Sequence, residues 1–253
     1  MKFDLGRRVL GLAAIFLGVV TFVWHDFNIW QQIQPLGNLS HPAIVVYLAA
    51  IVQTFGGLAL QSRRTAPGGA IALGVVYLMF ALLWLPVFIA NPRVYGNLGS
   101  FFEQFSLVCG ALIVYAASGF GNREQSRKLA RLGYFGFGIC VISFMLEQLL
   151  NLRATADFVP KWIPPGQMFW SVVTTIAFAL GAIALLSGPK ALLAARLITA
   201  MILGFGLFVW LPAPFADRHD VNNWAGNGVN LAIAGAAWVV ADFLYKRSSA
   251  TSA

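Results

Sequence analysis

Long apolar runs alternate with short polar segments along the whole chain. A bilayer core about 30 Å thick requires about 20 apolar residues per helical crossing. Eight runs reach this length, at approximately residues 9–30, 43–60, 70–90, 101–120, 132–150, 168–186, 191–211 and 227–245. Their uniform apolar character favours helices over the alternating strands of a β-barrel. The pattern predicts an all-α membrane protein with eight transmembrane helices.

The composition supports this fold class. Hydrophobic residues make up 59% of the 253 residues and charged residues only 10%. A soluble domain carries roughly 25% charged residues, because its surface faces water. The composition therefore excludes a soluble globular protein and places the chain in contact with the lipid bilayer.

The basic residues indicate the orientation in the membrane. With the N-terminus inside, thirteen of the 17 Lys and Arg residues fall in cytoplasmic segments, and four fall outside. This positive-inside bias predicts cytoplasmic N and C termini and a multi-pass protein of the bacterial inner (cytoplasmic) membrane. The net charge of +8 then reflects topology. Anionic lipid headgroups, and not nucleic acid, are the expected partners of these charges.

The two halves of the chain resemble each other. Similar segments include Leu10-Gly11 and Leu132-Gly133, and Trp84-Leu85-Pro86 and Trp210-Leu211-Pro212. Four helices per half is an even number, so both halves have the same orientation. We predict two parallel four-helix-bundle repeats, residues 1–120 and 131–253, joined by a cytoplasmic linker at 121–130.

Polar residues gather near the predicted outer ends of the spans. Polar side chains within a membrane usually face the bundle interior or a wet cavity. Helical spacing groups them on the first, fifth and last spans, and Glu103 with Gln104 enters the fourth at a comparable depth. The candidate ligand-binding residues are His25, Glu103, Glu147, Gln148, Asn223, Trp224, Asn227 and Asn230.

Each group also has a structural interpretation. Asn227 and Asn230 are suited to hydrogen bonds between helices, and Cys109 and Cys140 to a buried core or a redox pair. The three histidines with an acid match the ligand preferences of copper or zinc, but they lack i, i+4 spacing. We therefore predict no metal site. The sequence identifies no catalytic residue and leaves open whether the protein is an enzyme.

The second half resembles the DoxX-like family of bacterial membrane proteins. The most specific part of this resemblance is a VPxWIPP segment followed by Phe-Trp, at Phe158-Val159-Pro160-Lys161-Trp162-Ile163-Pro164-Pro165-Gly166 and Phe169-Trp170. The resemblance covers about residues 130–245, and the first half resembles a diverged copy. It implies a four-helix unit and an association with membrane redox systems, with a quinone as the candidate ligand. Relatives often have His where this chain has Gln148.

These observations lead to three hypotheses of function. The first is a component of a membrane redox system that binds a quinone-like or small lipophilic ligand near the outer leaflet. Glu147 and His25 would exchange protons or hydrogen bonds with the ligand, Asn227 and Asn230 would orient it, and Trp162, Phe169 and Trp224 would shield it. The second is a small-molecule permease or exporter. The third is a membrane scaffold that recruits a partner protein.

Overall fold

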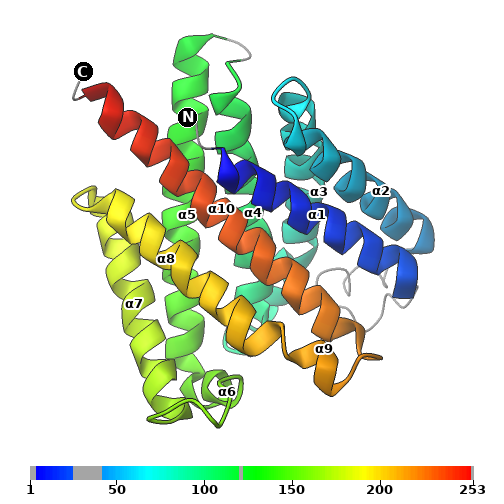
Figure 1. The fold of residues 1–253 in the computed structure, drawn as a ribbon, viewed down its shortest axis with the longest axis vertical. Helices are drawn as coiled ribbons and strands as arrows, with labels where there is room; N and C mark the ends of the chain where they lie inside the picture. Colours follow the sequence, from blue (N-terminus) through cyan, green and yellow to red (C-terminus); the bar gives the residue numbers. More distant parts are fainter. Residues whose placement is uncertain (1–3, 25–41, 120–121, 252–253) are drawn as a thin grey trace.

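A computed structural model describes residues 4–24, 42–119 and 122–251, which form helices joined by turns and short irregular segments (Figure 1). Eight of the helical stretches are long and apolar enough to cross a membrane, which confirms the prediction of a multi-pass, all-helical membrane protein for the described residues. The elements are α1 (Leu5–Trp24), α2 (Pro42–Gln61), α3 (Ala66–Ala90), α4 (Asn97–Ala117), α5 (Arg123–Leu150), α6 (Leu152–Asp157), α7 (Gln167–Ser187), α8 (Ala191–Phe205), the π-helical segment η2 (Gly206–Trp210), α9 (Ala213–Ala216) and α10 (Val221–Thr251).

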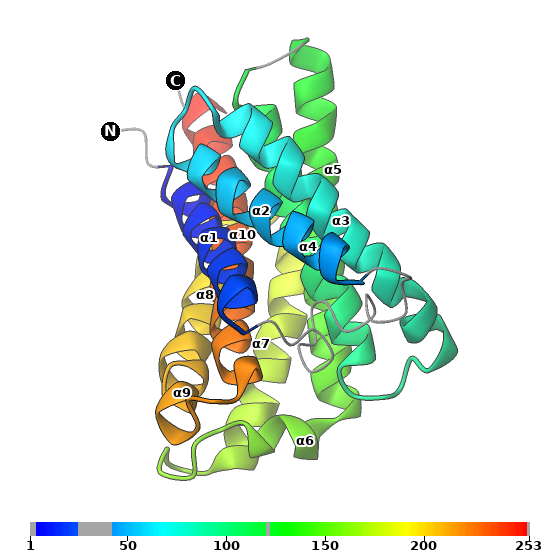
Figure 2. The same cartoon turned by 90° about the vertical axis from the view of Figure 1, so that its right-hand side faces the viewer.

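Four helices form the centre of the molecule. α1, α4, α5 and α10 lie between α2 and α3 on one flank and α7 and α8 on the other (Figure 1, Figure 2). Both ends of the chain lie at one end of the bundle, and α6 and α9 lie at the opposite end. The order of neighbours α1–α2–α3–α4 has a counterpart in α5–α7–α8–α10. Two copies of one unit would give this order, but the repeats and the cytoplasmic placement of the termini remain predictions.

Glycine allows the backbones of α1 and α10 to pack directly against each other. A Cβ atom on Gly235 would lie 2.5 Å from the backbone nitrogen of Leu10. On the same helix, Ala232 and Ala236 are fully buried. Small residues commonly allow membrane helices to approach closely. The contact between the first and last spans therefore depends on the absence of bulky side chains.

α5 begins well before the apolar run that predicted it. The Asn122 side chain accepts a hydrogen bond from the backbone N–H of Glu124 at 2.8 Å, and Lys128 pairs with Glu124 at 2.6 Å. An N-cap and an i, i+4 ion pair both stabilise a helix start outside the membrane. Most of the predicted linker 121–130 is therefore the first part of α5, which begins at Arg123.

The seventh span changes its helical form near its end. α8 passes at Gly206 into the π-helical segment η2, and Pro212 follows within two residues. In the third span, by contrast, α3 continues through Pro86 to Ala90. The two similar Trp-Leu-Pro segments therefore differ in local structure.

At the end that carries the termini, Asp4 joins three segments of the chain. Its carboxylate pairs with Arg63 and Lys246 at 2.9 Å each, and Arg7 lies 3.9 Å away. Burial alone would raise the pKa of Asp4. The hydrogen bond from Lys246 and the positive charges of Lys246, Arg63 and Arg7 together lower the pKa of Asp4 below its usual value.

The two cysteines are core residues. Cys109 on α4 and Cys140 on α5 are both free and buried. The two helices pack along one another. This position agrees with their interpretation as small residues of a tight helix contact.

Candidate functional site

A cavity of about 420 Å³ lies among α4, α5, α8 and the first turns of α10, toward the end opposite the termini. Its wall combines polar and aromatic side chains from segments far apart in the sequence. The acidic and amide residues are Glu103, Gln104, Glu147, Gln148, Asn222, Asn223 and Asn230. The aromatic residues are Tyr95, Phe144, Phe158, Phe178, Phe205 and Trp210. Small-molecule sites commonly have this composition, mostly apolar with a few convergent polar groups.

Five of the eight candidate residues line this one cavity. They are Glu103, Glu147, Gln148, Asn223 and Asn230. Trp224 and Asn227 line a neighbouring groove between α8, η2, α9 and α10, where Asn230 also contributes. His25 lies outside the described residues. Polar residues of the fourth, fifth and last spans thus meet at the same end of the bundle, whereas the polar stripe predicted on the first span lies outside the described residues.

Glu147 caps the N-terminus of α4. Its Oε1 accepts a hydrogen bond from the backbone N–H of Gly96, the residue before the helix, at 2.6 Å. Its Oε2 contacts Gly99 so closely that a Cβ atom there would overlap with it. The unpaired N–H groups and positive dipole end of a helix stabilise a carboxylate in this position. Glu147 therefore has a structural role as well as a place in the cavity wall.

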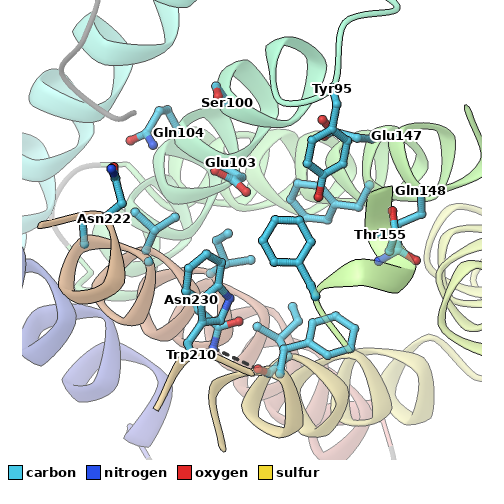
Figure 3. A pocket seen from close by; sticks show the side chains of 18 of the residues that line it. Tyr95, Ser100, Glu103, Gln104, Glu147, Gln148, Thr155, Trp210, Asn222 and Asn230 are labelled. Carbon is cyan, nitrogen blue, oxygen red and sulfur yellow. Dashed lines mark hydrogen bonds between the residues drawn. The ribbon is translucent and has the colours of Figure 1, made fainter. Parts of the chain in front are cut away.

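Glu103 is held differently. Figure 3 shows its side chain directed into the cavity. Within residues 4–24, 42–119 and 122–251, its carboxylate accepts no hydrogen bond and forms no ion pair, and no Lys, Arg or His lines the cavity. An acidic group within a membrane span is expensive unless a partner or water satisfies it. The carboxyl group of Glu103 is thus available to form hydrogen bonds with a ligand in the cavity.

Gln148 is held against α7 and lines the cavity. Its amide group lies 3.1 Å from the hydroxyls of Thr174 and Thr175, which also donate to the carbonyls of Trp170 and Ser171 on their own helix. These contacts orient the amide, and its other end is a hydrogen-bonding group for the cavity.

The asparagines of α10 bind backbone carbonyls near the irregular end of α8. Asn230 Nδ2 donates to the carbonyl of Ile202 at 3.0 Å. Asn227 Nδ2 donates to the carbonyls of Trp210 at 2.6 Å and Asn223 at 2.8 Å. A π-helical segment disturbs the regular hydrogen-bond ladder, and side-chain amides can satisfy the carbonyls that it frees. These contacts match the structural interpretation of Asn227 and Asn230.

Most of the residues that line the cavity were not among the candidates from the sequence, and three of them lie outside the long spans or at the end of one. Tyr95 lies between α3 and α4, Thr155 on α6, and Trp210 at the end of η2. Phe158 joins two of them, with its ring 5.9 Å from that of Tyr95 and 6.1 Å from that of Trp210. Burial, and then the charges of Glu147 and Glu103, raise the pKa of the Tyr95 phenol above its usual value, so it remains a donor at neutral pH. Thr155 Oγ1 is buried beside the Tyr95 phenol and has no other hydrogen-bond partner among the described residues.

The three residues predicted to shield the ligand lie around the cavity and do not enclose it. Trp162 lines an adjoining apolar groove and is 70% exposed, and Trp224 lines the groove beside α9. Phe169 is half exposed. The rings that enclose the cavity itself are those of Phe144, Phe178 and Phe205, with Phe158 and Trp210.

A metal centre finds no support in the described part of the chain. No group of three or more His, Cys, Asp or Glu residues there is placed to hold a metal ion. His25 and His41 lie outside the described residues, so the structure does not show whether the three histidines meet.

Searches with models of protein families, against curated proteins and against solved structures find no match for this chain. The fold alone defines its class, an integral membrane protein with eight apolar spans.

Proposed function

We propose that this protein binds a small lipophilic ligand in the cavity between α4, α5, α8 and α10. It does so as a component of a membrane redox system, and a quinone-like molecule is the first candidate ligand. One observation carries the proposal. Glu103 presents its carboxylate, which is unpaired among the described residues, to a cavity of about 420 Å³ whose wall includes six aromatic side chains.

The remaining residues supply complementary groups for a polar head. The Tyr95 phenol is a donor for a carbonyl oxygen, the Gln148 amide group can hydrogen-bond to a second polar atom, and the carboxyl group of Glu103 can exchange a proton with the ligand. Phe158 and Trp210 offer faces on which a flat ring stacks. The resemblance of residues 130–245 to DoxX-like proteins is the reason to place a quinone first.

The location of the protein and the orientation of its cavity in the membrane are part of this proposal. The proposed setting is the bacterial inner membrane, with the termini in the cytoplasm and the cavity near the outer leaflet. The excess of basic residues in the segments next to the termini supports this orientation. A redox partner protein in the same membrane would complete the system.

Thermal unfolding of the protein in lipid nanodiscs tests the proposal. A short-tailed ubiquinol analogue, kept reduced in the absence of oxygen, at about 100 times its Kd is expected to stabilise the protein by about 2.7 kcal/mol, a rise in Tm of about 5 °C or more. The E103Q variant is expected to lose most of this rise. E124Q, which changes an exposed acid on α5, should retain it. A Tm that no quinone analogue changes, in wild type as in E103Q, would show that the cavity is not a quinone site.

A further inference from the structure

An apolar groove of about 550 Å³ adjoins the cavity. It lies between α7, α8 and η2, and the segment that carries the VPxWIPP motif covers one side. Six residues line both spaces, namely Tyr95, Gln148, Thr155, Phe158, Phe205 and Trp210. Side chains alone therefore separate the polar cavity from the groove.

The groove opens on the lipid-facing flank of the second half. Trp162 and Phe208 on its rim are 70% and 44% exposed. In a membrane protein such apolar side chains face the acyl chains. The space exists partly because residue 204 is a glycine, where a Cβ atom would meet nothing within 4 Å. A chain of methylenes can reach this groove directly from the bilayer, without passing through water.

The two adjoining spaces differ in chemistry. Glu103 lines only the cavity, and its carboxylate can only accept hydrogen bonds while it is ionised. Thr155, whose hydroxyl is buried, lines both spaces. Among the described residues that line either space, none is Lys, Arg or His. While Glu103 is ionised, an anionic headgroup would be repelled, whereas a head that donates hydrogen bonds would satisfy its carboxylate.

We propose that the site takes an amphiphile from the side, with a hydrogen-bond-donating head at Glu103 and an apolar tail in the groove between α7 and α8. This rests on the proposed function, since it assumes that the cavity binds a lipophilic ligand. For a quinone couple, the form that the ionised carboxylate of Glu103 prefers is the hydroquinone, because its hydroxyls donate to the carboxylate and the quinone oxygens only accept. One hydroxyl donates to Glu103, and the other oxygen hydrogen-bonds to the amide group of Gln148.

A matched pair of ligands tests the head assignment without any variant. A decyl-substituted benzoquinone and its hydroquinone carry the same tail and differ by two hydrogens. Binding of each radiolabelled form to the protein in nanodiscs is measured without oxygen, with empty nanodiscs as the background. The hydroquinone is expected to bind at least tenfold more tightly. A tenfold preference raises the midpoint potential of the bound two-electron couple by about 30 mV.

Two variants separate the head from the tail. In E103Q the preference for the hydroquinone is expected to fall below threefold. G204L fills the groove and should weaken both forms at least tenfold. The matched control is G68L, since a Cβ atom on Gly68 of α3 also meets nothing within 4 Å.

Each outcome has a separate meaning. Equal or tighter binding of the quinone overturns the donor assignment. Equal binding by G204L and G68L proteins overturns the placement of the tail. If neither form binds the wild-type protein, the proposed function itself fails, which is distinct from a failure of either assignment.

Discussion

The carboxylate of Glu147 accepts a hydrogen bond from the backbone N–H of Gly96 at 2.6 Å, across 51 residues of sequence. The end of α5 thus caps the start of α4, and it does so beside the cavity that Glu103 faces. These two acids therefore have different roles. Glu147 caps a helix terminus, and Glu103 faces the cavity.

We expect E147A to lower the stability of the protein more than it weakens ligand binding. Loss of a helix cap removes about 1–2 kcal/mol. In a chain of this size this lowers Tm by several degrees. Thermal unfolding in nanodiscs measures the change, with E124A as the control because Glu124 is exposed and pairs only with Lys128. Equal stability of E147A and E124A would show that the bond to Gly96 is not stabilising.

Gly99 provides an independent test of the same contact. A Cβ atom at this position would overlap with the carboxylate of Glu147. We expect G99A to lower the free energy of unfolding, because the added Cβ atom displaces the Glu147 carboxylate. In the G99A background the cap is already lost, so E147A should lower the free energy of unfolding by less than it does in the wild-type protein. A double-mutant cycle measures this coupling, for which about 0.5–3 kcal/mol is usual between residues in contact. G74A is the control, since its Cβ atom would meet Ala111 at an ordinary 3.6 Å. Additive effects of G99A and E147A would contradict the proposed contact.

The spans could be predicted from the sequence because each apolar run is long enough to identify a crossing by itself. Glu147 and Asn230 could be selected because a polar residue at membrane depth needs a partner. Their convergence could not be derived, since it depends on how α4, α5 and α10 pack. The aromatic residue Tyr95 was missed for another reason. It lies in a connecting segment, where no helical period assigns it to a face.

The role of Glu147 shows a second limit of the sequence. A carboxylate that caps a helix and one that binds a ligand are the same residue type at the same depth. The partner, Gly96, lies in a turn and gives no sign of bonding to a residue on α5. Similarly, the start of α5 was missed because a hydrophobic run cannot reveal the cap at Asn122.

Asp4 predicts a pH dependence of stability. Its pKa in the folded protein lies below its ordinary value of 3.8, because Lys246, Arg63 and Arg7 favour the charged form. A lowered pKa contributes stability above the unfolded value, and this contribution is lost as pH falls through the folded value. We therefore expect D4N to be less stable than wild type at pH 7 and the difference to shrink as pH falls below about 4. Unfolding of both proteins between pH 7 and 3 measures the difference. A difference that does not shrink toward pH 3 would exclude the ion pairs of Asp4 as its source.

Substitution of Gly235 tests whether the first and last spans depend on backbone contact. In an exposed helix, Gly→Ala is favourable by about 1 kcal/mol, because alanine has the higher helix propensity. At Gly235 the added Cβ atom would lie 2.5 Å from the backbone nitrogen of Leu10, and backbone cannot move aside cheaply. Overpacking of this kind usually costs about 1–3 kcal/mol, so the net effect of G235A is expected to be a loss of stability. G204A supplies the matched control, because its Cβ atom meets nothing and only the gain in propensity remains. Thermal unfolding of the two variants in the same nanodiscs should therefore move Tm in opposite directions. A rise in Tm for G235A would mean that α1 and α10 are farther apart in the membrane than this contact requires.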